Sequence, residues 1–587
     1  MDPLAAILPA DQDSKTAVVD ANNIEALSSD NCTLASGHST STVGHSRQSS
    51  LSELQTTMSC FEGVSSRLKS VFSAKGQQYQ EQNTRLIEKV SSKLAAPAKS
   101  ETEPGLAEKK KANGHQVAPG KFEQENHFYP RVLNAQIHPL VASFFGLGNE
   151  RIIARYAHLR PMVDQDKLRE LLNYRPKYFS WAGSDLFNVT TSTGQHQMIV
   201  VETNSCPSGQ KSMPLLQESD EFGGYRVVIR SAFRDLLEDT ECDGDLAVVY
   251  DKNPMEASGY AAVLAEESGE HVWLVEFHDT DADPPVRWKD RVMLIRDSSG
   301  KWHRIRACFR YITQRPWNRI PIHTRTRILN PVIACLAGGR NKMMAARAYE
   351  IFNSELREHN LSVRAPLTAY NVVRDEIPMW IESMGGHAVI KDPYSNAGQG
   401  VWTITNEKDL DSFMSLDHRY DKFIVQSLVG NSSWSSTTQD GCFYHVGTIP
   451  NKNSNIFVSD IRMMVAAASD GFRPVSTYAR RARNPLIRRL EDDPDATSWG
   501  MLGTNLSVRN SDGSWSTESQ RLMLMDRKDF NQLGIGIDEL IDGYIQTVLS
   551  VIAIDKMCQR LVDNDRFDCN LFRTLNPDEA LISEITL

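Results

Sequence analysis

The chain of 587 residues lacks an uninterrupted apolar stretch of the roughly 18 residues that a membrane-spanning helix requires. We therefore expect no transmembrane helix and no membrane partner. The chain also lacks an excess of basic side chains, because 64 lysines and arginines stand against 74 aspartates and glutamates, a formal charge of −10. Nucleic-acid-binding domains are usually basic, so this balance argues against a nucleic-acid partner.

Closely spaced cysteines are missing as well. Nine cysteines are scattered between Cys32 and Cys569, and no two of them have the C-x-x-C spacing typical of metal sites. An odd number of scattered cysteines is typical of free thiols in a reducing compartment, so we expect a cytoplasmic protein. The first residues include a short apolar patch without a basic segment before it, so we expect no secretory signal.

Residues 1–120 contain few large apolar side chains and are rich in Ser, Thr, Asn, Gln and Lys. Such a segment cannot bury enough apolar surface to offset the entropy lost on ordering, so we expect a disordered tail. Apolar residues recur at helical spacing in two stretches, 61–72 and 86–94. These stretches are either short marginal helices of the tail or helices that dock on the main body or on a partner.

Residues 121–330 are predicted to form a second unit with α/β character, a leading domain. The β-branched, apolar segments 245–250 and 272–276 are typical of strands, and a helical pattern covers 255–267 between them. A strand-helix-strand unit of this length predicts a parallel sheet.

A polar loop follows another predicted strand of this unit, which begins at Ile199. Ligands bind where the strands of a parallel sheet end, so Glu202, Asn204 and Lys211 are candidates for substrate contact. Glu202 would suit a substrate amine. The alternative is a turn whose polar side chains satisfy their own backbone, and both interpretations stay open.

The segment 389–401 combines a strand, a lysine and a pair of glycines. Its β-branched strand ends in Lys391, and a polar loop with Gly398 and Gly400 leads to a second strand. A compact ammonium group on a strand suits a phosphate oxygen. Glycines let backbone N–H groups approach a triphosphate closely. The alternative is an ordinary β-hairpin with a solvated lysine.

Further motifs lie on both sides of this segment. They occupy residues 338–342 before a helical pattern, then 423–430, 460–465, 474–481, 503–507, 567–572 and 582–586. Their order resembles the ATP-grasp superfamily, and the section with the letters DIR, RR and TNLS is most similar to its carboxylate-amine ligase branch. The resemblance covers roughly residues 330–587. It implies an α/β ATP-grasp domain at 331–587, preceded by the α/β leading domain and the tail.

The resemblance implies a role for each matching residue. The implied phosphate-binding residues are Lys342 and Lys391, with Gly398 and Gly400 as a flap, and the implied adenine hinge is Gln426 with the backbone of Leu428. The implied cations near the transferred phosphoryl group are Arg462 and Arg480. The implied Mg²⁺ ligands are Asp568 and Glu584. Any one of them alone could be a solvated surface residue. Phosphoryl transfer needs cations around the γ-phosphate and hard oxygen ligands for Mg²⁺, and together the set supplies both.

The sequence departs from the family pattern at two of these motifs. The terminal metal motif of the family usually reads Glu-x-Asn, whereas here Glu584 is followed by Ile585 and Thr586. A threonine hydroxyl is a poorer Mg²⁺ ligand than an amide oxygen, so an altered metal site is one expectation. The family's asparagine loop commonly continues with glycines, but Leu506 follows Asn505 here.

The implied activity is that of an ATP-dependent ligase. A substrate carboxylate would attack the γ-phosphate to give an acyl phosphate and ADP, and an amine would then displace phosphate to form an amide. The implied cofactors are ATP and Mg²⁺, and the implied partners are a small carboxylate and a small amine. Two alternatives remain open, a small-molecule kinase on the same fold and an ATP-binding protein without catalysis.

Overall fold

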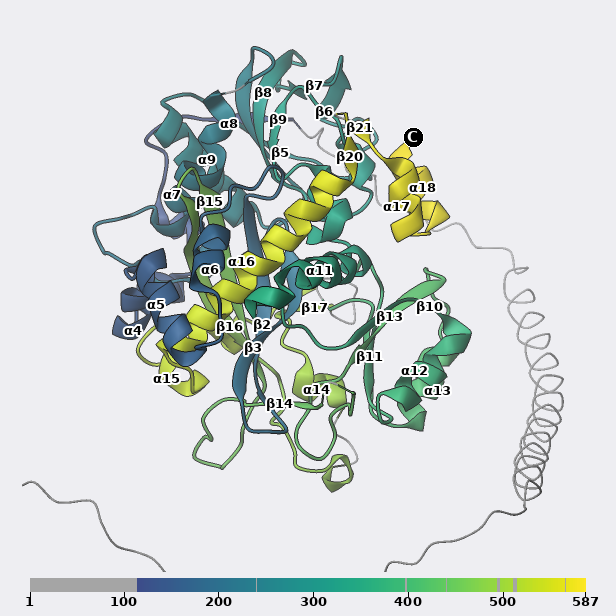
Figure 1. The fold of residues 1–587 in the computed structure, drawn as a ribbon. Coiled ribbons are helices and arrows are strands. Elements are labelled where there is room, and N and C mark those ends of the chain that lie inside the picture. The colour runs from purple at the N-terminus through teal and green to yellow at the C-terminus, as the bar shows by residue number, and fades with distance from the viewer. Residues whose placement is uncertain are drawn as a thin grey trace, which may run out of the picture. The chain divides into compact units, whose positions relative to one another are not determined.

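The computed structural model describes residues 113–238, 240–395, 398–439, 441–493, 497–509, 515–564 and 566–586. Most of the predicted tail, including its two helical stretches, lies outside the described residues. The last part of the range 1–120 does form structure, because β1, His115–Val117, pairs antiparallel with β5, Val272–Glu276. The α/β character predicted for the chain is confirmed by three large sheets and the helices that cover them (Figure 1).

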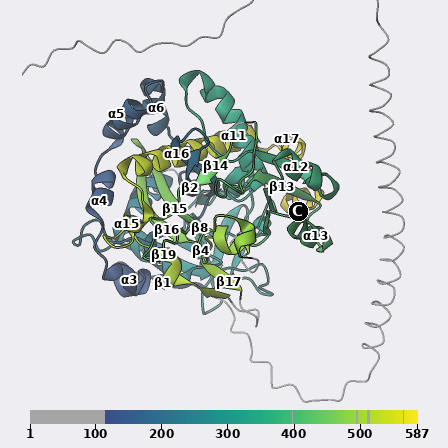
Figure 2. The ribbon, with the colours of Figure 1, turned by 90° about the horizontal axis from the view of Figure 1, so that it is seen from below.

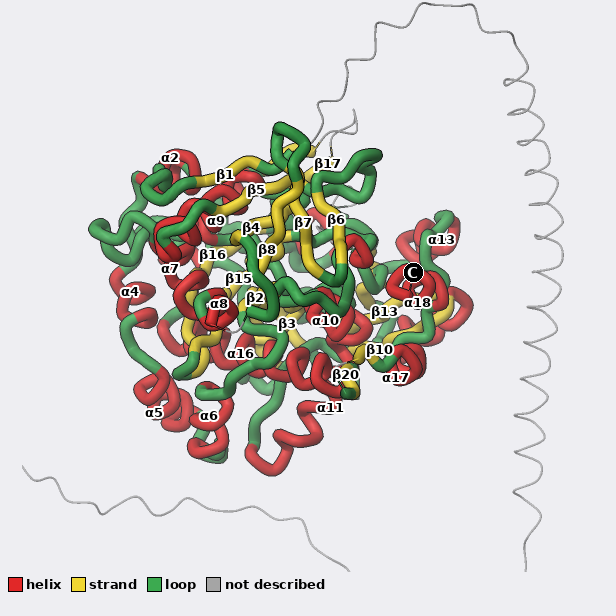
Figure 3. Tube along the Cα trace, turned by 90° about the horizontal axis from the view of Figure 1, so that it is seen from above, coloured by secondary structure: helices red, strands yellow, loops and turns green. Residues whose placement is uncertain are grey.

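The first sheet contains the predicted strand-helix-strand unit. β4, Asp245–Tyr250, pairs in parallel with β5, and α9, Pro254–Ser268, connects the two strands. β8, Trp302–Tyr311, runs parallel to β4 on its other side. The row β1, β5, β4, β8, β7 and β6 is visible in Figure 3. The strands not yet given are β6, Val286–Lys289, β7, Val292–Arg296, and β9, Arg327–Leu329, which pairs with β8.

The second sheet is antiparallel and joins segments that are far apart in the sequence. β2, Trp181–Thr191, pairs with β3, His196–Asn204, along one edge and with β15, Ser459–Ala468, along the other. β15 pairs in turn with β16, Gly471–Arg481. The end strands are β14, Phe443–His445, and β19, Leu522–Met523. The predicted boundary at residue 330 therefore does not divide this sheet, because strands from both sides of it pair with each other.

Alternation along these strands gives the second sheet two different faces. α16, Ile537–Arg560, crosses one face, where Leu186 and Met463 belong to a large apolar core (Figure 1). On the other face, Trp181 packs at 5.1 Å, centroid to centroid, against Phe309 of the first sheet. Farther along β2 on this second face, Asp185 places a charged side chain in the lining of a cavity.

The third sheet has four antiparallel strands in the order β10, β13, β11, β12. Alternate residues such as Ile390 and Val425 are buried against α12 and α13, which lie beside β13 in Figure 2. The residues between them, including Lys391 and Gln426, face a cavity. The bounds are β10, Thr368–Val373, α12, Ile377–Ser383, β11, Ala388–Lys391, β12, Val401–Ile404, α13, Glu407–Ser415, and β13, Lys422–Ser427.

Two further properties follow from the described part of the chain. Within it, no helix has both the length and the apolar composition needed to cross a bilayer. The seven cysteines placed in these segments are all free thiols.

Candidate functional site

A cavity of about 520 Å³ lies where the three sheets meet. Seven basic side chains line it against three carboxylates. They are Lys211, Lys252, Arg340, Lys342, Lys391, Arg462 and Arg480, with Asp185, Glu202 and Asp460. A cavity with this excess of positive charge attracts a polyanion, such as a chain of phosphates.

Glu202 reaches the cavity through an irregularity in β3. Glu202 pairs with Asp185 and Val200 pairs with Leu186, so Val201 is left as a bulge. A bulge changes the direction of neighbouring side chains, and both Val201 and Glu202 line the cavity. β3 belongs to an antiparallel sheet, so the reason given for this site, a loop after a parallel strand, was wrong.

Lys391 and Lys342 lie close together at one end of the cavity. Lys391 is only 7% exposed, and its Nζ donates to Gln426 Oε1 at 2.6 Å. Burial, together with the nearby ammonium of Lys342, lowers the pKa of Lys391 to about 8. Lys342, at the start of α11, Lys342–Leu356, donates to a backbone carbonyl and lies 3.8 Å from the Glu202 carboxylate. An anion between the two lysines would relieve their mutual repulsion.

The predicted phosphate flap contains one glycine at the cavity and one behind it. Gly398 lines the cavity with a φ of +73°, and a Cβ there would lie 2.9 Å from Asn505 Nδ2. Gly400 has a φ of +62°, and a Cβ there would lie 2.2 Å from an oxygen of Asp392. Gly398 therefore permits a close approach across the cavity, whereas Gly400 makes room for the turn.

The predicted adenine hinge is corrected in part. Gln426 lines the cavity and donates through Nε2 to Thr368 Oγ1 at 2.8 Å. Leu428 is 1% exposed, and its backbone N–H already donates to Ser436 Oγ at 2.7 Å. The Leu428 carbonyl accepts from the Ser436 N–H at 3.0 Å. A base could not bind through the backbone of Leu428 unless these two bonds opened.

Arg462 and Arg480 line the cavity but are bound to carboxylates of the protein. Arg462 holds Asp185 through two hydrogen bonds of 2.6 and 2.8 Å. Arg480 lies 2.8 Å from Asp185 and also binds Asp460. Burial opposes the ionisation of Asp185, but the two arginines outweigh it and hold its pKa well below the usual range. These cations therefore carry little uncompensated charge.

The two predicted metal ligands lie outside the cavity. Asp568 caps the N-terminus of α17, Cys569–Leu575, where it accepts a backbone N–H at 2.9 Å. Glu584 lies on α18, Glu579–Thr586. Its carboxylate accepts hydrogen bonds from Arg315 Nε and from the Trp317 backbone N–H, each at 2.9 Å. Both carboxylates have partners within the protein and neither lines the cavity, so their assignment as metal ligands of this site is corrected.

Glu202 is a better candidate for a metal ligand. Among the described residues its carboxylate has no hydrogen-bond partner, only the ion pair with Lys342. Residues 202–204 have the Glu-x-Asn pattern that is altered at residues 584–586. No group of three or more His, Cys, Asp or Glu suited to a metal occurs within the placed segments, so a metal here would need oxygens from a ligand.

The other end of the cavity lies at the carboxyl ends of β4 and β8. Lys252 and Asn253 follow β4, and Gln314 follows β8. Lys211 donates to Asn253 Oδ1 at 3.3 Å and lies 3.9 Å from buried Glu256. Burial opposes the charge of Lys211, but Glu256 outweighs it and raises its pKa. The predicted substrate residue Lys211 is thus held in place by a buried carboxylate.

The sequence reasoning did not single out four charged residues of the site. Arg340 lies inside the motif 338–342, and Asp460 begins the DIR segment, so both were present in recognised motifs. Asp185 gave no signal because its partner Arg462 is 277 positions away in the chain. Lys252 is the second residue after a predicted strand, which is the one sequence feature that could have indicated it.

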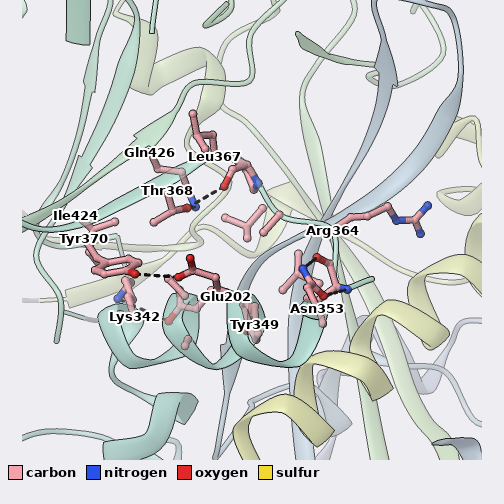
Figure 4. Close-up of a pocket in the computed structure, with 18 of the residues that line it drawn as sticks. Glu202, Lys342, Tyr349, Asn353, Arg364, Leu367, Thr368, Tyr370, Ile424 and Gln426 are labelled. Carbon is pink, nitrogen blue, oxygen red and sulfur yellow. Dashed lines mark hydrogen bonds and ion pairs between the residues drawn. The ribbon is translucent and has the colours of Figure 1, made fainter. Parts of the chain in front are cut away.

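A second cavity, of about 860 Å³, adjoins the first. Figure 4 shows Glu202 and Lys342 at its edge, with Tyr349 on α11 and Tyr370 on β10. Lys391, Gln426, Glu202 and Lys342 line both cavities. Five basic side chains line the second cavity, compared with seven in the first, and about half of its lining residues are aliphatic or aromatic.

Comparison with known proteins gives similarity to solved structures only. A scan of known protein families finds no match, and neither does a search of curated proteins. A glutathione synthetase-like effector from Globodera pallida is 11% identical with a TM-score of 0.31, covering 58% of this chain and 81% of that one. A RimK-domain ATP-grasp protein from Sphaerobacter thermophilus is 13% identical with a TM-score of 0.24, covering 40% and 90%.

A third solved structure is the ATP-grasp ligase PsnB with a minimal precursor, 12% identical with a TM-score of 0.23, covering 45% of this chain and 95% of that one. Two of these three neighbours are named as ATP-grasp proteins, the superfamily that the sequence resembles. The function proposed below is derived from the cavity of this chain.

The lowered pKa of Lys391 predicts a pH-dependent cost in stability. Its pKa falls from 10.5 to about 8 on folding, so the unfolded state binds the proton more tightly between these values. The cost is fully present below about pH 8 and disappears as the pH rises past 10.5. Lys391→Met should therefore raise the free energy of unfolding near neutral pH, by up to about 3 kcal/mol.

Urea denaturation at several pH values measures this effect. Exposed Lys408 on α13 provides a control, and Lys408→Met should change stability by less than about 0.5 kcal/mol. A gain for Lys391→Met that shrinks between pH 8 and 10.5 is expected. A destabilised Lys391→Met, or a gain independent of pH, would contradict the assignment.

Proposed function

We propose that the cavity binds ATP and that the chain is an ATP-dependent ligase, which joins a carboxylate to an amine through an acyl phosphate. The observation that carries this proposal is the meeting of Lys342, Lys391 and Glu202 at one end of the cavity. Two ammonium groups beside a carboxylate without a hydrogen-bond partner match the oxygens of a triphosphate and its accompanying metal ion.

The adenine base would lie in the apolar part of the same cavity. Phe187 of β2, Val201 of β3 and Val389 of β11 line this part from two sheets. The ring of Phe187 is fixed by an edge contact with His445 at 4.5 Å between centroids. An aromatic ring and flanking valines suit the face of a base, and Gln426 provides an amide at its edge.

The phosphates would lie between Lys342 and Lys391. In the structure the Lys391 ammonium donates a hydrogen bond to Gln426, and the Lys342 ammonium donates one to a backbone carbonyl. Phosphate oxygens would replace these neutral acceptors with charged ones, which give hydrogen bonds about twice as strong. They would also remove the repulsion that lowers the pKa of Lys391.

Mg²⁺ would be held by Glu202 together with phosphate oxygens. This ion commonly takes one or two protein carboxylates and completes its shell with phosphates and water, so a single free carboxylate fits. When bound, it would neutralise charge that develops on the transferred phosphoryl group. Asp185 and Asp460 are engaged by arginines and do not compete for it.

The chemistry proceeds in two displacements. A carboxylate oxygen of the acid attacks the γ-phosphorus and ADP leaves, so that this oxygen bridges the acyl and phosphoryl groups. The amine then attacks the acyl carbon, loses a proton and expels inorganic phosphate, which is a far better leaving group than the oxygen of a free carboxylate. One oxygen of the acid thus ends in phosphate.

The free thiols agree with a cytoplasmic enzyme, which stays a prediction.

Isotope transfer from the acid to phosphate tests the proposed reaction. Incubation of the full chain with ATP, Mg²⁺, an amine and ¹⁸O-labelled carboxylates should yield ADP and labelled inorganic phosphate in equal amounts. Mass spectrometry of the phosphate measures the label. A phosphorylated product without phosphate release would indicate a kinase, and nucleotide binding without turnover would indicate a binding protein. AMP with pyrophosphate would contradict the acyl phosphate.

Substitution of Glu202 tests the metal assignment. Glu202→Gln should lower the rate of ADP formation by about 100-fold or more, because the metal contribution to transfer is lost. Binding of an ATP analogue should weaken much less. Glu350→Gln is the matched control, because Glu350 lines only the second cavity and accepts from the Tyr370 hydroxyl at 2.8 Å. Equal rates in both variants would remove Glu202 from the metal site.

A further inference from the structure

Lys252 lies in the cavity without a partner. It is the second residue after β4, and its ammonium forms no hydrogen bond or ion pair with any residue in the described segments. The adjacent Asp251 offsets only part of its charge. That carboxylate already accepts the N–H groups of Thr313 and Gln314 at about 3 Å and an N–H of Arg319 at 3.1 Å. The ammonium of Lys252 is therefore available to an anionic group of a bound ligand.

The surroundings of Lys252 differ from those of Lys391. Burial, followed by the guanidinium of Arg340, lowers the pKa of Lys252 to about 8. The charges that act on Lys391 are instead those of Lys342, Glu202 and Asp185. The cavity thus has two cationic centres, which we call the Lys391 centre and the Lys252 centre. The first comes from the third sheet and α11, and the second from the end of β4.

Asn204 provides independent support for a ligand at the Lys252 centre. Asn204 is only 4% exposed, and its side-chain Oδ1 accepts a hydrogen bond from Arg340 at 2.9 Å. Because arginine can only donate, this contact fixes which way the amide points. Its Nδ2 is buried and has no hydrogen-bond partner among the residues described. A buried N–H donor without an acceptor suits an anionic oxygen of a bound molecule.

The backbone holds Lys252 in this position. Asn253 has a left-handed conformation with a φ of 52°. Its Oδ1 accepts from Lys211 at 3.3 Å, and its Nδ2 donates to the Tyr311 hydroxyl at 3.4 Å. Such a backbone is unusual for a residue other than glycine and is kept where the surroundings fix it. The turn that carries Lys252 is thus built into the carboxyl end of the parallel sheet, where ligands bind.

We propose that Lys252, Arg340 and Asn204 form a subsite for a second carboxylate of the acid substrate. This inference rests on the proposed ligase function and adds the class of its acid, a dicarboxylate. The carboxylate that attacks phosphorus must lie against the γ-phosphate, at the Lys391 centre. The Lys252 centre then holds the other carboxylate through an ammonium, a guanidinium and an amide N–H. It fixes the acid for attack and rejects acids that lack the second group.

Chemical labelling of Lys252 tests this subsite in the full chain. Trace acetylation at pH 8, with Mg²⁺ and a non-hydrolysable ATP analogue present, is quantified by mass spectrometry. The probes are malonate, succinate, glutarate and adipate, each beside the monocarboxylate of the same chain length. At least one dicarboxylate should suppress acetylation of Lys252 severalfold more than its monocarboxylate does. Exposed Lys289 of β6 is the internal control and should be labelled equally throughout.

Each outcome decides a different part of the inference. Equal protection by mono- and dicarboxylates would overturn the second carboxylate, and no protection by any probe would overturn the subsite. Asn204→Leu should reduce the protection, and Lys252→Gln should weaken calorimetric binding of the best probe, with Lys289→Gln as its control. Labelling needs no turnover, so it reports on the subsite even without catalysis. Absence of ADP formation with every acid would instead count against the ligase function.

Discussion

Asp185 lies between the guanidinium groups of Arg462 and Arg480, and this buried ionic contact holds together the part of the second sheet that lines the cavity. Asp185 of β2 pairs directly with Arg462 of β15, and Arg480 of β16 pairs with Asp460 of β15. A buried charge is tolerated only when it is paired, and removal of one member of such a network costs about 3–5 kcal/mol. Because Asp185 and Asp460 neutralise Arg462 and Arg480, the excess positive charge of the cavity falls mainly on Lys252, Lys342, Lys391 and Arg340.

The lysines divide this charge between two places. Lys342 and Lys391 meet near Glu202, and Lys252 lies after the end of β4 within the electrostatic influence of Arg340. Burial lowers the pKa of both Lys391 and Lys252 to about 8, so the folded protein holds two ammonium groups at a cost in stability. Such a cost in stability is typical of a binding site for an anion, because the attraction of a bound anion offsets the free energy that the buried ammonium groups cost in the empty site.

Local parts of this account could be predicted from the sequence, and long-range parts could not. The unit from β4 to β5 was predicted because its strand and helix periodicities each lie within a short segment. The strand of Lys391 was recognisable for the same reason. The pairing of β2 with β15 depends on residues about 280 positions apart, such as Asp185 and Arg462, and no local pattern reports it.

The metal ligands illustrate the same limit of local reasoning. Asp568 and Glu584 were assigned by the order of motifs along the chain, but their carboxylates cap α17 and bind Arg315. The fold instead brings Glu202 to the lysines from a strand more than a hundred positions earlier in the chain. Leu428 was assigned to the adenine hinge, but β13 ends at Ser427 and the Leu428 N–H donates to Ser436 Oγ, a contact that depends on the path of the following loop.

The central claim is that the triphosphate of ATP lies between Lys342 and Lys391. The most direct measurement is a crystal structure of the full chain with Mg²⁺ and a non-hydrolysable ATP analogue. The γ-phosphate should lie between these two lysines beside Glu202, with the base against Phe187 and Val389. A nucleotide bound in the second cavity, between Tyr349 and Tyr370, or its absence from both cavities at saturating concentration, would contradict the account.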